Sequence, residues 1–317
     1  MARVLVTGVT GQIGSYLAEE LLGAGHDVVG LGGPDSTPLP AGVRPATGTL
    51  DDAHHLLREN GPLDAVIHLA ASSSVAASWD NPMATFRTNG QLGAALAFAN
   101  AKAPRARFVH ASSAEIFGNA ALPLQDEDTP IVPISPYAVA KAASHFAVKV
   151  SREGLGCEAS NLIFYLGESP RRSKGFVFRK ITRTVAAIAC GDATELTLGN
   201  TGVVRDFCHA RDLARAAMLL ALGAAAGDYV CASGEGHTVL DVATTACRIA
   251  GVPPGVIRSD PELVRANDIR SLVGDSSRLR ALGWRPSIGF EALVREILEH
   301  DIAAHRMGRG LTQEGSA

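Results

Sequence analysis

The sequence is poor in the features that mark several classes of protein. Its 317 residues include five cysteines, none of them close to another in the chain. An odd number of scattered cysteines argues against a disulfide framework or a zinc site and favours a reducing compartment, so we expect a cytoplasmic protein. No apolar run reaches membrane-spanning length, and the N-terminus enters a strand-like run too early for a signal peptide, so we expect no membrane association.

Long blocks of one charge are also missing. The net charge of −3 comes without a basic stretch, which excludes the electrostatic footprint of a nucleic-acid-binding protein. His54 and His55 have no further ligand-type neighbours at metal spacing, so we predict that they lie on a helix surface and that no metal is bound. With 46% hydrophobic residues the chain can bury a sizeable core, and we expect a globular protein.

Short β-branched runs alternate with helical patterns from the first residue. Runs that are apolar throughout, separated by helices, predict a parallel sheet covered on both faces, which is a Rossmann-like, doubly wound α/β fold. After about residue 165 the alternation loosens, which predicts a smaller mixed region. We expect the larger unit to span residues 1–165 and to include 204–231, the smaller to span 166–203 and 232–307, and a loose tail to follow over 308–317.

A turn rich in glycine separates the first strand from the first helix. Gly8, Gly11 and Gly14 in "VTGVTGQIGSYL" would let the backbone approach a pyrophosphate at a helix N-terminus, which predicts a dinucleotide cofactor. An acidic side chain at the end of the second strand would favour NAD, whereas an arginine at the same place would favour NADP. Gly32 and Gly33 stand there without charge, and Asp35 lies farther along the loop, so the choice within NAD(P) stays open.

The stretch "SPYAVAK" predicts a second functional feature. Pro136 suits the first turn of a helix, and the spacing of four puts Tyr137 and Lys141 on one helix face. Lowering a phenol pKa from about 10 to about 7 needs roughly 4 kcal/mol, which a nearby ammonium can largely supply in a partly desolvated site. Tyr137 would then serve as a general base near neutral pH.

Together these motifs resemble the short-chain dehydrogenase/reductase superfamily, in its extended branch that modifies nucleotide sugars. The resemblance covers nearly the whole chain and includes "HASSAEIFG". It implies that Ser113 hydrogen-bonds the sugar hydroxyl, Tyr137 takes its proton, and Lys141 holds the nicotinamide ribose. It also implies that Glu115 is the base of a 4,6-dehydratase, because a C4 ketone acidifies the hydrogen on C5 and a carboxylate can remove it while C6 loses water.

Four later stretches resemble the GDP-mannose 4,6-dehydratase family: "QDEDTPIVPISPYAVAK", "ESPRRSKGFVFRKITR", "LGNTGVVRDF" and "DIRSLVGDSSRLRALGWRPSIGFEALVREI". The resemblance implies a lyase that oxidises C4 transiently, eliminates water across C5 and C6, and returns hydride to C6. It implies a GDP-hexose bound by Ser73, Arg171, Lys180, Arg205 and Arg265. It further implies NAD(P) contacts from Gly8, Gly11, Gln12, Ile13, Gly14, Leu50, Leu69, Ala70, Ala71, Tyr137 and Lys141.

The chain departs from this family at several positions, which keeps alternatives open. Leu166 and Gly167 stand where the family has Asn and His before "ESP", and an arginine-bearing insertion after the second strand is missing. The nearest alternative is an NAD(P)-dependent nucleotide-sugar 4-ketoreductase or epimerase of the same superfamily. A remote one is a non-catalytic cofactor-sensing protein, although such proteins commonly lose the Tyr or Lys that this chain keeps.

Small residues recur on two predicted helices, at about 81–102 and 135–154. They would allow close helix approach, either to a second copy of the chain or within one chain. In the superfamily the equivalent helices form a four-helix dimer interface, so the resemblance implies a homodimer. The small residues concerned are Gly90, Gly93, Ala94, Ala97, Ala138, Ala142, Ala143 and Ala147.

Overall fold

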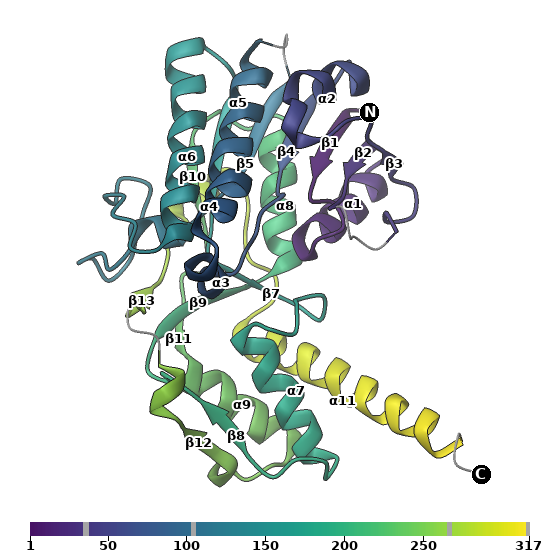
Figure 1. The fold of residues 1–317 in the computed structure, drawn as a ribbon, viewed down its shortest axis with the longest axis vertical. Helices are drawn as coiled ribbons and strands as arrows, with labels where there is room; N and C mark the ends of the chain where they lie inside the picture. Colours follow the sequence, from purple (N-terminus) through teal and green to yellow (C-terminus); the bar gives the residue numbers. More distant parts are fainter. Residues whose placement is uncertain (34–37, 103–105, 265–267, 315–317) are drawn as a thin grey trace.

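A computed structural model of the chain describes residues 1–33, 38–102, 106–264 and 268–314, without the side chains of 308–314. Figure 1 shows a large layered unit that contains the N-terminus and a smaller unit below it that contains the C-terminal helix. The two units meet where strands β7 (Leu166–Glu168) and β9 (Val204–His209) cross the middle of the molecule. All five cysteines are free thiols.

The large unit is built on a seven-stranded sheet in the order β10-β6-β5-β4-β1-β2-β3, and every neighbouring pair is parallel. The order reverses at β1, as in doubly wound dinucleotide-binding folds. This confirms the predicted α/β class. The strands are β1 (Arg3–Thr7), β2 (Asp27–Leu31), β3 (Arg44–Pro45), β4 (Ala65–His68), β5 (Arg107–Ser113), β6 (Ala159–Phe164) and β10 (Asp228–Cys231).

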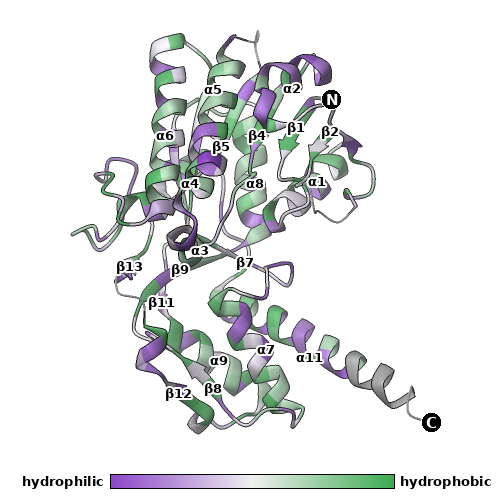
Figure 2. Cartoon of the chain, in the orientation of Figure 1, coloured by the Kyte–Doolittle hydropathy of each residue, from purple (hydrophilic) through white to green (hydrophobic). Residues whose placement is uncertain are grey.

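Helices cover both faces of this sheet, which is why its strands are apolar throughout. One face packs against α1 (Gln12–Gly23) and α8 (Ala210–Ala221), and α8 is coloured largely hydrophobic in Figure 2. The other face packs against α2 (Ala53–Asn60), α5 (Leu92–Lys102) and α6 (Pro136–Leu155). Short helical segments connect them: η1 (Leu50–Asp52), α3 (Val75–Asp80), α4 (Pro82–Thr85), η2 (Phe86–Gln91) and η3 (Ala114–Phe117).

The predicted helix over 81–102 is interrupted. Between α4 and α5 the chain forms the π-helical segment η2, which includes Asn89. The Asn89 side chain accepts a hydrogen bond from the Ser72 N–H and donates one to the Ser72 carbonyl, both at 2.8 Å. The π-helical turn therefore lies where the buried Asn89 amide holds the loop that follows β4. The helical periodicity of the sequence does not reveal this contact.

The smaller unit surrounds its own apolar core. Strand β9 pairs with β7, β11 and β13, and β8 pairs with β12. The predicted boundary at residue 204 therefore falls at the start of a strand of this small sheet, whereas α8 and β10 lie in the large unit. The elements are β8 (Leu196–Leu198), β11 (Gly236–Thr238), β12 (Ile257–Ser259), β13 (Ser271–Leu272), α7 (Val177–Ala189), α9 (Val239–Ala250), α10 (Ser277–Ala281), α11 (Phe290–Glu314), η4 (Pro254–Val256) and η5 (Pro261–Leu263).

A row of polar residues crosses the middle of the large sheet. The strand register places Thr7, His68, His110, Asn161 and Asp228 side by side on β1, β4, β5, β6 and β10. The first four are at most 1% exposed. The row lies in the sheet that α6 covers, so it is close to the predicted catalytic helix.

The last helix, α11, runs to Glu314, so the expected tail from residue 308 overlaps its end. Within the described residues, no helix combines the length and the apolar character needed to cross a bilayer.

Candidate active site

The glycine turn leaves no room for side chains. Gly8 has φ +74°, and a Cβ added to it would lie 2.7 Å from the Ala70 nitrogen. A Cβ on Gly14 would lie 2.1 Å from the Gly8 carbonyl oxygen. Gly11 is the N-cap of α1 and supplies no side-chain cap, so the first N–H groups of the helix face the turn without an intrahelical partner. Such a turn is suited to a pyrophosphate.

The other residues expected to bind the cofactor lie around this turn. Gln12 and Ile13 begin α1, and the Gln12 amide donates to the Gly167 carbonyl of β7 at 2.9 Å. Leu69, Ala70 and Ala71 follow β4, beside Gly8, and Leu50 begins η1. They lie beyond the carboxyl ends of the parallel strands, where open α/β sheets bind ligands.

The four expected catalytic residues come from the end of β5 and the start of α6. Ser113 ends β5, Glu115 lies in η3, and Tyr137 and Lys141 lie one turn apart in α6. Ser135 caps α6 by accepting from the Ala138 N–H at 3.1 Å, with Pro136 in the first turn as predicted. The Ser113 side chain interacts with the Tyr137 phenol, so these two groups lie together.

The charge state of Tyr137 differs from the expectation. Burial raises the pKa of Tyr137 to about 12; the Ser113 hydrogen bond and Arg172 act to lower it, and the Glu115 charge to raise it. Lys141, which was expected to lower this pKa, is not among these groups, and its ammonium donates to the Ala111 carbonyl at 2.8 Å. Burial also lowers the pKa of Lys141, to about 8. The protein's own groups therefore hold the phenol protonated.

Two buried histidines lie close to Lys141. His68 and His110 stack with ring centroids 5.5 Å apart; His68 Nδ1 contacts the Thr7 hydroxyl at 2.7 Å, and His110 Nε2 contacts the Ser144 hydroxyl at 3.0 Å. Burial, and then the charge of Lys141, lower the pKa of His68 to about 3 and that of His110 well below its ordinary value. Both rings are therefore neutral, which keeps further positive charge away from the Lys141 ammonium.

The residues expected to bind the substrate do not all lie together. Ser73 is exposed in the loop after β4, and Lys180 is exposed on α7. Arg205 is buried on β9, where it donates to the carbonyls of Val204 and Ile269 and pairs with Asp268 at 3.0 Å. Arg265 lies outside the described residues.

Arg171 lies away from the position that the resemblance implies. Its guanidinium donates to the Ser15 hydroxyl at 3.0 Å and to the Glu19 carboxylate at 2.5 Å, both on α1. It also lies 3.8 Å over the Tyr16 ring. Arg171 therefore belongs to the surroundings of the glycine turn, because an exposed carboxylate and an aromatic face on α1 bind it there.

Arg172 is a residue of the site that the prediction from the sequence did not include. Its charge reaches Tyr137, and its guanidinium lies 3.5 Å over the Phe176 ring. Its Nε is 3.8 Å from Glu168, whose pKa burial raises to about 7 although Arg172 and Arg179 act to lower it. The signal in the sequence for the position of Arg172 is its spacing of four from Glu168. That spacing lies in the stretch "ESPRRSKGFVFRKITR", which was interpreted only as a family motif.

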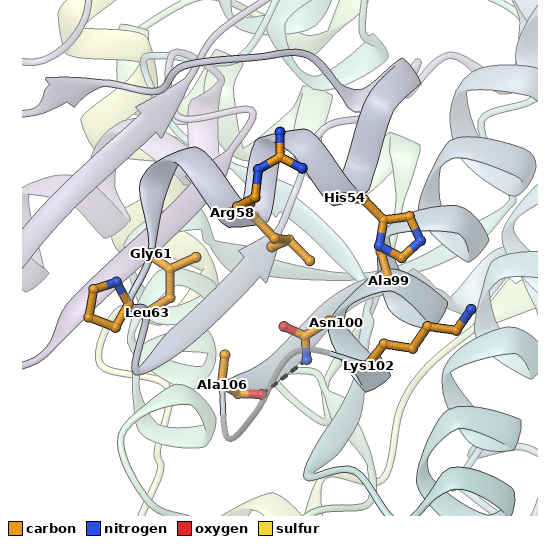
Figure 3. Close-up of a pocket in the computed structure, with 10 residues that line it drawn as sticks. His54, Arg58, Gly61, Leu63, Ala99, Asn100, Lys102 and Ala106 are labelled. Atoms are coloured by element: carbon orange, nitrogen blue, oxygen red, sulfur yellow. Dashed lines mark hydrogen bonds between the residues drawn. The ribbon is translucent and has the colours of Figure 1, made fainter.

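Two hollows of the described surface bear on the location of the site. One, of about 330 Å³, lies at the glycine turn and includes Thr10, Gly11, Ser15 and Arg171. The other, of about 400 Å³, lies between α2 and α5, where His54, Arg58 and Lys102 surround it (Figure 3). The residues that lead into β4 and β5 line this second hollow, so it opens at the amino ends of the strands, opposite the catalytic cluster.

His54 is exposed on α2, as predicted. Among the described residues, no group of three or more His, Cys, Asp or Glu side chains is arranged to hold a metal ion.

Comparison with known sequences gives a consistent result over nearly the whole chain. The profile of the family described as GDP-mannose 4,6 dehydratase matches residues 5–297. GDP-mannose 4,6 dehydratase 2 of Arabidopsis thaliana is 36% identical, with 98% of this chain and 90% of that protein aligned. GDP-mannose 4,6-dehydratase sdnI of Sordaria araneosa is 35% identical, with 96% of this chain aligned, but the chain spans only 62% of that protein's length.

Solved structures of related enzymes have the same fold. The UDP-glucose 4-epimerase of Thermus thermophilus in complex with NAD gives a TM-score of 0.84 at 29% identity, covering 95% of this chain and 99% of that one. RMD from Pseudomonas aeruginosa complexed with NADPH gives a TM-score of 0.81 at 27% identity, and the match covers 96% of this chain and 100% of that one.

Proposed function

The chain belongs to the GDP-mannose 4,6-dehydratase family, and on that basis we propose that it is a nucleotide-sugar 4,6-dehydratase, an NAD(P)-dependent lyase. One observation carries the proposal: the Ser113 and Tyr137 side chains interact with each other, and the Glu115 charge reaches the same phenol. A simple oxidoreductase needs the first two groups. The carboxylate beside them supports elimination, because it supplies a second base.

The dinucleotide fits the residues present. The turn at Gly8 and Gly14 has the close backbone approach that a pyrophosphate requires, and the α1 N-terminus faces it. Lys141 is buried and makes one hydrogen bond to a carbonyl, which leaves ammonium protons for the nicotinamide ribose. NAD(P), when bound, supplies the hydride acceptor for C4 and the hydride donor for C6.

The chain's own groups perform the proton transfers. Ser113 positions the C4 hydroxyl of the sugar, and Tyr137 takes its proton. Glu115 then removes the C5 proton once C4 is a ketone and passes it to the C6 hydroxyl, which leaves as water. Burial raises the pKa of Tyr137 to about 12, and Ser113 and Arg172 are the chain's own groups that act to lower it and so favour the phenolate.

A GDP-hexose, with GDP-mannose favoured, is the substrate we propose. Its diphosphate needs fixed cations, and Lys180, Arg205 and Arg265 are the candidates that the family resemblance supplies. Arg171 leaves this set, because its guanidinium bonds to α1. Leu166 begins β7 where the resemblance implies an asparagine, so an apolar side chain stands there in place of an amide.

A ketoreductase or epimerase of the same superfamily is the second candidate. The observation that favours it is the replacement of the family's Asn and His by Leu166 and Gly167 on β7, since β7 contacts the glycine turn through Gln12. Substrate contacts on this strand therefore differ from those of the family.

Incubation of the purified protein with GDP-mannose and no added reductant separates the candidates. A dehydratase converts it to a 4-keto-6-deoxy product, visible by ultraviolet absorbance and as the loss of one water by mass spectrometry. A ketoreductase would act only on a keto-sugar with NAD(P)H, an epimerase would give a product of unchanged mass, and a sensor would turn over nothing. Any of these three results would refute the dehydratase assignment.

A homodimer through α5 and α6 is also part of this proposal. Gly90 and Gly93 serve contacts within the chain, since a Cβ on Gly90 would lie 3.1 Å from the Ala140 carbonyl oxygen and one on Gly93 3.1 Å from the Ser144 Cβ. Large apolar side chains remain exposed on the same helices and on η2: Phe86, Phe98, Val139, Phe146 and Val150. An apolar face of this kind supports association with a second copy. Light scattering that gives a monomer at micromolar concentration would refute it.

A further inference from the structure

A buried ion pair joins α7 and α11, which lie side by side in the smaller unit (Figure 1). Arg179 of α7 is 4% exposed and Asp301 of α11 is 5% exposed. The Asp301 carboxylate accepts from Arg179 Nε at 3.3 Å and from Nη2, and the Thr182 hydroxyl donates to its Oδ2 at 2.7 Å. His300 also faces this carboxylate, with its Nδ1 3.5 Å from Oδ1. The pair therefore holds the Arg179 guanidinium in one orientation.

The remaining nitrogen of this guanidinium holds the loop between β7 and α7, residues 169–176, which we call the Arg172 loop. Arg179 Nη1 donates to the carbonyl of Pro170 and, at 3.0 Å, to that of Arg172. A planar guanidinium presents N–H groups at fixed angles, so it can bind a carboxylate with one edge and two carbonyls with another. An ammonium lacks this geometry. The contact therefore depends on an arginine and not on a positive charge alone.

The Arg172 loop carries a charge that acts in the active site. Arg172 is one of the chain's own groups that act on the Tyr137 phenol, and its charge favours the phenolate. Its guanidinium lies 3.5 Å over the Phe176 ring of the same loop, and its Nε lies 3.8 Å from Glu168. Within the part of the chain that the structure describes, this buried Nε has no hydrogen-bond partner. The position of the charge therefore follows the course of the loop.

We propose that the Arg179–Asp301 pair positions the Arg172 loop against the Tyr137 phenol. Both members of the pair are positioning residues that act through Arg172, because the charges that act on the phenol are those of Arg172 and Glu115. The last helix of the chain thereby contributes to the reactivity of a base in the large unit. This inference rests on the proposed function, in which Tyr137 takes the proton of the C4 hydroxyl.

Arg179→Lys tests the proposal, because it keeps the charge and removes the planar fork. The Arg172 charge should then leave the phenol, and the pKa of Tyr137 should rise. In single-turnover C4 oxidation, followed by reduced nicotinamide absorbance, the pH midpoint should rise by about half a unit or more, an about threefold lower rate at a fixed pH below it. Asp301→Asn should give a smaller shift in the same direction. Arg183→Lys, the same change at an exposed position of α7, is the matched control and should give none.

A double variant decides whether Arg179 acts through Arg172. Arg172→Gln should itself raise the midpoint, and adding Arg179→Lys should raise it no further, because no guanidinium is left to position. Additive shifts, or an unchanged midpoint in Arg179→Lys, would overturn the proposal. Melting curves of each variant establish that it is folded. If Arg179→Lys does not fold, the isosteric Asp301→Asn takes its place in the same comparison, and an unchanged midpoint there would overturn the proposal equally.

Fluorine NMR gives a readout that needs no turnover. The chain has four tyrosines, and meta-fluorotyrosine at all of them gives signals of which that of Tyr137 is identified by its loss in Tyr137→Phe. The Tyr137 signal should move in Arg172→Gln and in the same direction in Arg179→Lys, while that of Tyr229 on β10 stays in place. An unmoved Tyr137 signal in Arg179→Lys would refute the positioning. Absence of C4 oxidation in the unmodified protein, with these signal changes intact, would count against the proposed function alone.

Discussion

The buried histidines near Lys141 should make the fold sensitive to mild acid. Burial is the main cause that lowers the pKa of His68 to about 3, that of His145 to about 4, and that of His110 well below its ordinary value. The same side chains titrate near 6.5 in an unfolded chain. Below pH 6.5 the unfolded state therefore binds protons that the folded state does not, and stability falls as the pH falls toward these lowered values.

The expected loss follows from the width of that pH window. Each histidine that stays neutral in the fold costs about 1.4 kcal/mol per pH unit below 6.5, so by pH 5 each costs about 2 kcal/mol and the three about 6. Glu168 acts in the opposite direction, because burial raises its pKa to about 7 and the folded state therefore binds a proton more tightly than the unfolded state. This offsets about 2 kcal/mol of the loss in stability. A net loss of about 4 kcal/mol is a large part of a typical unfolding free energy of 5–15 kcal/mol.

Urea unfolding followed by circular dichroism at pH 6.5 and pH 5.0 measures this loss by linear extrapolation. Replacing His68 by Asn should reduce the difference between the two pH values by about 2 kcal/mol, whatever the variant's own stability at pH 6.5. His54→Asn, on the exposed face of α2, is the control and should leave the difference as in the unmodified protein. Equal stability at both pH values, or an unchanged difference in His68→Asn, would show that the buried rings do not control acid stability.

Three further predictions concern the catalytic end of the sheet. Tyr137→Phe should abolish hydride transfer, measured as the absence of reduced nicotinamide absorbance in single turnover; retained transfer would exclude Tyr137 as the base. Glu115→Gln should still permit C4 oxidation but block exchange of the C5 hydrogen with deuterated water, and full dehydration in this variant would refute the assignment of Glu115. Because the Glu115 charge raises the pKa of Tyr137, the same variant should move the pH midpoint of C4 oxidation downward. Gly14→Ala places a Cβ 2.1 Å from the Gly8 carbonyl oxygen and should weaken dinucleotide binding at least about tenfold by calorimetry, and unchanged affinity would mean that the turn is not the cofactor site.

Local patterns in the sequence predicted much of this structure because the determining contacts are local. The glycine turn, the cap at Ser135 and the placement of Tyr137 and Lys141 one turn apart on α6 each depend on neighbours within a few residues. The placement of Arg171 could not be predicted in this way, since Ser15 and Glu19 lie more than 150 residues away in the chain.

The phenol's raised pKa was missed for a related reason. The Tyr137–Lys141 spacing indicates that the two side chains share a helix face, but it does not show that the ammonium turns toward a carbonyl of β5. Burial by the surrounding elements then dominates the energetics of both groups. A pattern along one helix cannot report how the neighbouring strands and loops desolvate its side chains.

One row of polar residues specifies the register of the large sheet. It consists of Thr7, His68, His110, Asn161 and Asp228. If one of these strands slid by a single residue, its member of the row would turn to the opposite face and be buried among apolar side chains without a partner. A shifted strand register therefore costs more free energy in this sheet than it would cost in a sheet made only of valine. The polar row that lowers the stability of this protein in acid therefore also gives five neighbouring strands, β10, β6, β5, β4 and β1, one arrangement in which to assemble.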